Sequence, residues 1–155
     1  MLTITRAVLE DAEAVLMLQK LAYQSEAKLY NDWSLPPLTQ SLESLLEEFA
    51  NSVVLKAMSG ERLVASVRAK AADGACVIGR LVVHPEFQGR GIGSTLLRRI
   101  EDSFSGVSKY RLFTGSKSEG NIRLYERHGY TITHTQVLSP TLSLIFMEKS
   151  ASAGR

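Results

Sequence analysis

Three glycines at alternate positions lie between an apolar run and an amphipathic pattern near the middle of the chain. The segment reads Leu81-Val82-Val83-His84-Pro85-Glu86-Phe87-Gln88-Gly89-Arg90-Gly91-Ile92-Gly93-Ser94-Thr95-Leu96-Leu97. The apolar run is typical of a buried strand, and the apolar residues after the glycines have helical spacing. A helix N-terminus offers unpaired backbone N–H groups and partial positive charge, and glycines let an anion approach the backbone closely. The segment therefore predicts a strand, an anion-binding loop and a helix.

Two common phosphate-binding motifs do not fit this loop. A dinucleotide-binding GxGxxG fingerprint started at Gly89 meets Ser94 where it requires glycine, and one started at Gly91 meets Leu96. A Walker loop needs Gly-Lys-Ser/Thr, and this tripeptide does not occur in the chain. The pattern that remains is Gln-x-x-Gly-x-Gly, filled by Gln88, Gly91 and Gly93.

Hydrophobic periodicity along the rest of the chain predicts an α+β fold in the order βααβββαβαββ. We expect strands at 2–6, 53–58, 63–70, 76–83, 110–114, 130–137 and 141–148, and helices at 10–29, after Thr39, at 91–104 and at 118–128. Pro36-Pro37 argues against helix at that point, and Thr39 is the expected N-cap of the next helix. Consecutive strands from 53 to 83 are expected to be antiparallel, with one parallel crossover around the third helix. Residues 1–149 are expected to form one domain, and 150–155 a frayed tail.

Composition narrows the class of protein. The length of 155 residues suits one domain, and the single cysteine, Cys76, excludes an internal disulfide and is read as a small buried hydrophobe. No signal peptide and no apolar run long enough to span a membrane is visible, so a cytoplasmic protein is expected. Residues 1–50 carry eight acidic and three basic side chains, whereas the remainder carries eight acidic and fifteen basic. This asymmetry indicates either two surfaces facing oppositely charged partners or a simple excess of acidic residues on the first helices.

At this point the sequence resembles the GNAT superfamily of N-acyltransferases, whose signature is Arg/Gln-x-x-Gly-x-Gly/Ala after an apolar strand. A second match lies at Asn121-Ile122-Arg123-Leu124-Tyr125-Glu126-Arg127-His128-Gly129-Tyr130, which is similar to the family's asparagine, a tyrosine four residues on, and a Gly-Phe/Tyr pair. Residues four apart share one face of a helix, so Asn121 and Tyr125 can address one ligand. The resemblance covers nearly the whole chain and implies a mixed, mostly antiparallel sheet flanked by helices.

The resemblance implies acetyl transfer from acetyl-CoA, as co-substrate, to a primary amine that attacks the thioester directly. Backbone groups of Leu81 and Val83 would pair with the pantetheine arm, and Asn121 would hydrogen-bond it. The hydroxyl of Tyr125 would protonate the departing thiolate. The pyrophosphate would lie against the backbone amides of Gln88, Gly89, Arg90, Gly91, Ile92, Gly93 and Ser94. For the outer phosphate of the coenzyme the candidates are Arg90, Lys117 and Arg123.

Direct attack needs an unprotonated amine and therefore a base. Some family members carry a glutamate on the strand before the glycine loop, but here that strand reads Cys76-Val77-Ile78-Gly79-Arg80-Leu81 and holds no carboxylate. Glu26, Tyr30 and Asp32 are the candidate bases, each with a plain alternative as a surface residue. Trp33 and His134 are weaker candidates for the border of an acceptor pocket. The acceptor itself is expected to be a small cationic molecule or a protein amine.

Two other functions remain open at this stage. A non-catalytic acyl-CoA sensor on the same fold is consistent with the missing strand carboxylate, and a module for another nucleotide is disfavoured by the absent Walker tripeptide. No metal-ligand spacing occurs, so no metal is expected. Nucleic acid and membrane partners are not expected, and a homodimer is open because exposed sheet edges can pair.

Overall fold

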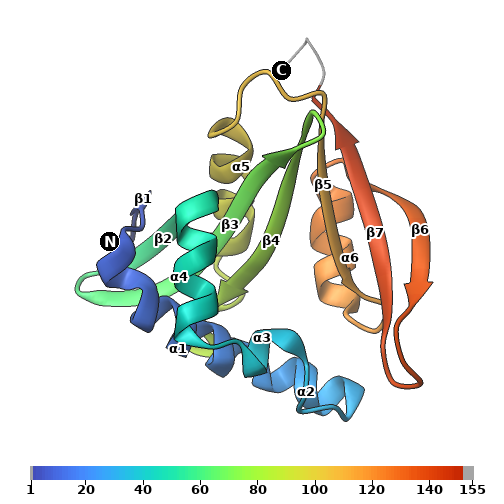
Figure 1. The fold of residues 1–155 in the computed structure, drawn as a ribbon, viewed down its shortest axis with the longest axis horizontal. Helices are drawn as coiled ribbons and strands as arrows, with labels where there is room; N and C mark the ends of the chain where they lie inside the picture. Colours follow the sequence, from blue (N-terminus) through green and yellow to red (C-terminus); the bar gives the residue numbers. More distant parts are fainter. Residues whose placement is uncertain (1, 152–155) are drawn as a thin grey trace.

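The computed structural model describes residues 2–151, which form one seven-stranded sheet with helices on both faces (Figure 1). The strand order is β1-β2-β3-β4-β5-β7-β6, and only β4 and β5 are parallel, so the α+β prediction of a mixed, mostly antiparallel sheet is confirmed. The strands are β1 (Leu2–Arg6), β2 (Val53–Ser59), β3 (Arg62–Ala72), β4 (Ala75–Val83), β5 (Lys109–Gly115), β6 (Thr131–Val137) and β7 (Ser143–Ser150). The helices are η1 (Leu9–Asp11), α1 (Ala12–Ala22), α2 (Gln24–Tyr30), α3 (Pro36–Thr39), α4 (Leu42–Asn51), η2 (Pro85–Phe87), α5 (Ile92–Asp102) and α6 (Glu119–Arg127).

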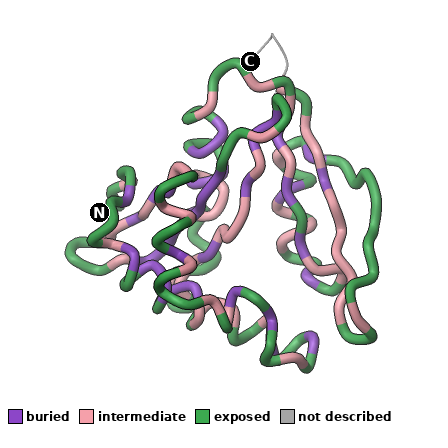
Figure 2. The backbone as a smooth tube through the Cα atoms, viewed as in Figure 1, coloured by how far each residue is buried: buried purple, intermediate pink, exposed green. Residues whose placement is uncertain are grey.

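The main core lies between the sheet and α5, with a smaller cluster between α1 and α4. Helix α5 begins just after the loop glycines and buries one apolar face against β2, β3 and β4. Figure 2 shows the central strands largely buried and β6 exposed along its length. Cys76 is fully buried in this core, as predicted. Burial raises the pKa of its thiol to about 12, so the thiol stays protonated and is not a reactive nucleophile.

The parallel pair β4 and β5 separates after a short contact. Only Ala75 to Val77 pair with Lys109 to Arg111. Beyond this point a β-bulge bends β4, because the register with β3 moves from Arg68 opposite Gly79 to Ser66 opposite Val82, and Arg80 takes a left-handed φ of 53°. Figure 1 shows the two strands diverging toward the end of the sheet where α2 and α3 lie. This divergence opens the space in which the candidate site is found.

Three local predictions about the first helices were wrong. The helix expected over 10–29 is divided into α1 and α2 at Tyr23. The Pro36-Pro37 pair, expected to prevent helix, occupies the first turn of α3, where a missing N–H donor costs nothing. The N-cap of α4 is Ser41 rather than Thr39, since the Ser41 hydroxyl accepts the backbone N–H of Ser44 at 3.1 Å.

The last strand of the sheet extends further toward the C-terminus than expected. Ser150 is the last residue of β7, and the backbone N–H of Ala151 donates to the Ser108 carbonyl at 3.0 Å. Ser150 and Ala151, which the prediction placed in the frayed tail, are therefore held by the sheet, and the rest of the predicted tail, 152–155, lies outside the described residues. No helix within 2–151 has the length and apolar character needed to cross a membrane.

Candidate active site

The glycine loop has the conformation of an anion-binding turn. Gly89 and Gly91 have φ values of 78° and 79°, which β-carbon-bearing residues rarely adopt, and Gly91 is the N-cap of α5. An added Cβ on either glycine would meet nothing within 4 Å, so the backbone is open on that side. Within residues 2–151 no acceptor is found for the backbone amides of 88–94, whereas Thr95 N–H bonds to the Gly91 carbonyl at 3.1 Å. The loop therefore presents free N–H groups at the positive end of α5.

Side chains of the loop hold it against its neighbours. Gln88 Nε2 donates to the Val83 carbonyl at 3.3 Å, which ties the loop to the end of β4. Arg90 is exposed, donates to the Glu86 carbonyl at 3.3 Å and lies over the Phe87 ring at 4.8 Å. These contacts leave the amides of the turn uncovered.

Two further loop positions begin α5. Ile92 is buried in the core, and Ser94 Oγ is 3.0 Å from His128 Nε2, which links α5 to the end of α6. Both side chains already have contacts within the protein, so these two residues can bind an anion only through their backbone N–H groups.

A cleft of about 530 Å³ runs from this loop between β4 and α6. Of the predicted cofactor-binding residues, it is lined by Leu81, Val83, Gln88, Gly93 and Asn121. Within the described residues β4 has no pairing with β5 from Ile78 to Val83, so this edge of β4 is free to bind an extended chain. The cleft thus has an anion-binding end and a strand-like wall.

A second cavity of about 220 Å³ lies deeper, between the diverging strands and the α2–α3 segment. It is lined by Tyr125 and by apolar side chains such as Leu35, Leu112 and Leu142. The cavity and the cleft have five lining residues in common, which are Tyr23, Glu26, Leu81, Ser118 and Asn121. The two spaces therefore adjoin, and a ligand in one can reach a ligand in the other.

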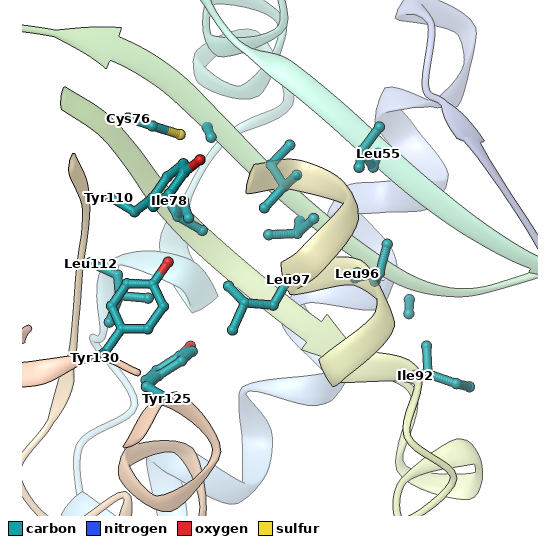
Figure 3. Packing of buried hydrophobic residues seen from close by; sticks show 14 of the residues in the cluster. Leu55, Cys76, Ile78, Ile92, Leu96, Leu97, Tyr110, Leu112, Tyr125 and Tyr130 are labelled. Carbon is teal, nitrogen blue, oxygen red and sulfur yellow. The ribbon is translucent and has the colours of Figure 1, made fainter. Parts of the chain in front are cut away.

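Tyr125 projects from α6 into the interior beside Tyr130 and near Leu97 (Figure 3). Its side chain is buried, its ring centroid is 6.0 Å from that of Tyr130, and it lines the smaller cavity. Burial raises the pKa of Tyr125 above that of an ordinary phenol, and the nearby Tyr23 and Glu26 raise it further. No hydrogen-bond partner for the Tyr125 hydroxyl is found in the described chain. The site thus holds a neutral phenol whose hydroxyl group donates no hydrogen bond to the described chain.

The three candidate bases have different positions. Glu26 lines both spaces, and its carboxylate accepts the Ser118 hydroxyl at 2.9 Å and Asn121 Nδ2 at 3.4 Å. Tyr30 lines the cavity, accepts the Lys117 backbone N–H at 2.8 Å, and has its pKa raised by burial. Asp32 lines neither space; it accepts hydrogen bonds from Ser34 and Thr141 and has a structural role in its loop.

The remaining candidates contribute unequally. Of the outer-phosphate candidates, Lys117 lines the cleft, whereas Arg90 and Arg123 are exposed beside it. Trp33 is exposed and His134 stacks on Phe146 at 4.4 Å, and neither lines the two spaces. Among residues 2–151 no group of three or more His, Cys, Asp or Glu side chains is placed to bind a metal ion.

Arg80 and Tyr23 both line the smaller cavity, although neither is among the residues predicted from the sequence. A signal for Arg80 was present, because a charged residue after a glycine within an apolar strand indicates a β-bulge. Tyr23 offered no such signal, because its position depends on the division between α1 and α2.

Comparison with known proteins matches residues 15–130 to the model of the Acetyltransferase (GNAT) family. PaiA N-acetyltransferase from Thermoplasma acidophilum, solved in complex with coenzyme A, superposes with a TM-score of 0.81 at 20% sequence identity, covering 97% of this chain and 99% of that one. The ribosomal-protein-S18-alanine N-acetyltransferase from Escherichia coli gives 0.81 at 18% identity, covering 98% and 95%. The putative acetyltransferase yncA from Salmonella typhimurium, solved with acetyl-CoA, gives 0.77 at 22% identity, covering 98% and 95%. At these identities the structures show a common fold.

Proposed function

Because the chain belongs to the GNAT acetyltransferase family, we propose that it transfers the acetyl group of acetyl-CoA to a primary amine of a small molecule. The observation that carries this proposal is the junction of two spaces at Glu26 and Asn121. One space leads to the free amides of the glycine loop, and the other contains the neutral phenol of Tyr125. Such a junction allows a long anionic cofactor and a small acceptor to meet inside the protein.

The residues present fit acetyl-CoA. The amides of 88–94 at the N-terminus of α5 suit the pyrophosphate, with Gly89 and Gly91 leaving the backbone open. The free edge of β4 at Leu81 and Val83 suits the amide groups of the pantetheine arm, although the Val83 carbonyl already accepts Gln88 Nε2. Asn121 faces the same cleft and supplies a further polar contact.

The chemistry needs two proton transfers. Acetyl-CoA supplies a thioester, whose carbonyl carbon the neutral acceptor amine attacks. Glu26, directly or through water, takes the proton that the amine loses, because its carboxylate lines both spaces. Tyr125 gives its phenolic proton to the leaving sulfur. Its raised pKa keeps the phenol protonated, so the proton is available when the carbon–sulfur bond breaks.

The test has two arms. Thermal-shift measurements compare stabilisation by acetyl-CoA, coenzyme A and ATP, and a thiol-release assay then follows acetyl transfer to a panel of amines. We expect stabilisation by the two coenzyme forms alone and thiol release with at least one amine. Stabilisation by acetyl-CoA without thiol release for any amine would favour the sensor function, and stabilisation by ATP instead would contradict the cofactor assignment.

A further inference from the structure

Arg80 is a cation without a partner in the wall of the smaller cavity. Its Nε atom is buried, and no hydrogen bond or ion pair to another residue of the described range 2–151 satisfies it. The residue lies in the bulge of β4 with a left-handed φ of 53°, a conformation that costs an ordinary side chain about 1 kcal/mol. Strain of this kind persists where the surrounding structure requires it, commonly at ligand sites. Arg80 lines the cavity but does not line the cofactor cleft.

The neighbouring carboxylates of the described chain form no hydrogen bond to Arg80. Glu48 is engaged by Arg68, which donates from Nε to Oε1 at 3.2 Å and from Nη2 to Oε2 at 3.0 Å. Gln40 donates to the same carboxylate, so both oxygens of Glu48 are occupied. Glu26, the carboxylate that lines the cavity, accepts Ser118 and Asn121 instead. The charge of Arg80 helps to lower the pKa of Glu48 from a distance, but Arg80 has no hydrogen-bonded carboxylate among the described residues.

A guanidinium without a hydrogen-bond partner beside apolar side chains is unfavourable unless a ligand accepts its hydrogen bonds. The planar fork of arginine donors matches a carboxylate, with which it forms two parallel charge-assisted hydrogen bonds. The volume of about 220 Å³ is below that of pockets for drug-sized ligands and suits a small metabolite. A carboxylate on such a metabolite would pair with Arg80 inside the cavity.

We propose that Arg80 binds the carboxylate of the acceptor, which is therefore a small amino acid rather than a simple polyamine. This inference rests on the acetyl transfer proposed above and specifies its substrate class. The two charges of the cavity are arranged for such a molecule, because Glu26 lines both spaces whereas Arg80 lines the inner one alone. The amine lies toward Glu26 and the thioester, and the carboxylate lies toward Arg80. Arg80 is thus a specificity-determining residue.

The experiment compares matched acceptors. Initial rates of thiol release are measured with free amino acids, with the carboxamide of each, with the decarboxylated amine of each, and with an aminoalkyl phosphate. The wild-type protein is compared with Arg80→Met, which keeps an unbranched apolar side chain, and with Arg80→Lys, which keeps the charge without the fork. Arg111→Gln is the control, since Arg111 also has a buried Nε without a hydrogen-bond partner, lies 3.9 Å from Glu148 in an ion pair, and lines neither space.

We expect the wild-type protein to prefer an amino acid over its carboxamide by at least tenfold in kcat/KM, as charge-assisted hydrogen bonds allow. Arg80→Met should remove this preference by raising the KM for the amino acid. Arg80→Lys should keep part of the preference, and Arg111→Gln should keep all of it. Equal use of acid and carboxamide by wild type, or preference for the aminoalkyl phosphate or the decarboxylated amine, would overturn the inference while leaving acetyl transfer intact.

A binding measurement separates the two proposals. Isothermal titration of the coenzyme A complex with the same amino acids should show binding to the wild-type protein and at least tenfold weaker binding to Arg80→Met. If no amine is acetylated although acetyl-CoA binds, the proposed transfer fails. Equal amino acid affinity of the two proteins, or no affinity in either, would overturn the role of Arg80 even in that case.

Discussion

The carboxylate of Glu26 accepts a hydrogen bond from the Ser118 hydroxyl at 2.9 Å and so joins α2 to the N-cap of α6. The two residues are 92 positions apart in the sequence. A second bond, at 3.4 Å, comes from Nδ2 of Asn121 in the first turn of α6. Glu26 is therefore held between its two donors at the junction of cleft and cavity, where the proposed mechanism has the acceptor amine lose its proton.

The first prediction concerns Glu26→Gln. The glutamine amide oxygen can still accept the Ser118 hydroxyl, but it cannot take a proton from the amine. We expect kcat to fall about 100-fold, the lower end of the range for general base catalysis, with little change in acetyl-CoA affinity. Steady-state kinetics and isothermal titration measure the two quantities. Glu13→Gln, on the exposed side of α1, is the control and should leave both unchanged. An undiminished kcat for Glu26→Gln would remove Glu26 from the mechanism.

A second prediction concerns the proton of Tyr125. Tyr125→Phe keeps the buried ring and its packing but removes the hydroxyl, so kcat should fall about 100-fold while the Kd of acetyl-CoA is nearly kept. Because burial holds the pKa of Tyr125 above that of a free phenol, the group stays protonated through neutral pH and into alkaline solution. The kcat profile of the wild-type protein should therefore show no alkaline decline near pH 9.

Tyr130→Phe provides the comparison for Tyr125→Phe. The Tyr130 hydroxyl donates to the buried Glu101 at 2.7 Å and lines neither space. Its removal should lower the free energy of unfolding by about 1–3 kcal/mol, because a buried acceptor loses a partner, and should not lower kcat. Chemical denaturation and steady-state kinetics distinguish the two tyrosines, and equal loss of kcat in both would contradict a specific role for Tyr125.

Local sequence was sufficient for the strand, loop and helix that form the cofactor end of the site. The free amides of the loop follow from Gly89 and Gly91 preceding an amphipathic helix, and this depends on neighbours within a few residues. The order of strands along the chain was also predictable, because turn residues and alternating patterns mark each strand. Asn121 and Tyr125 both line the smaller cavity because they lie four residues apart on α6.

The acceptor end depended on contacts distant in sequence. Tyr30, at the end of α2, packs directly over Gly115 of β5. A side chain at Gly115 would clash with the Tyr30 hydroxyl. Such a contact leaves no periodic pattern in either segment. Likewise, the lack of a partner for Arg80 depends on Arg68 engaging Glu48, and these three residues come from three separate elements.

A third prediction tests the glycine loop. Gly91→Val places a branched side chain at a φ of 79° on the N-cap residue of α5, in the open space beside the loop. We expect the Kd of acetyl-CoA to rise more than tenfold, with a stability cost of about 1–2 kcal/mol from the backbone. Gly106→Val is the matched control, because Gly106 has a φ of 78° and open space around it but lies outside the glycine loop at the start of α5. Comparable coenzyme binding by the two variants would contradict the pyrophosphate assignment.

A fourth prediction concerns the acid stability of the protein through Glu48. Burial tends to raise the pKa of Glu48, but the charge and hydrogen bonds of Arg68, the bond from Gln40 and the more distant charge of Arg80 outweigh this and hold it below its ordinary value. Because the folded pKa is the lower one, the stabilisation is fully present above the unfolded pKa of about 4.3 and is lost as pH falls through the folded value.

The measurement is the thermal midpoint of unfolding between pH 6 and pH 3 for wild type, Glu48→Gln and Glu47→Gln. Glu48→Gln removes the charge opposite Arg68, which is 5% exposed, so it should lower the midpoint at pH 6 and show a shallower decline toward pH 3. Glu47 is exposed and adjacent, so Glu47→Gln should follow the wild-type curve at both ends. A wild-type slope retained in Glu48→Gln would mean that other carboxylates, such as Asp11 paired with Lys56 at 2.9 Å, carry the acid sensitivity.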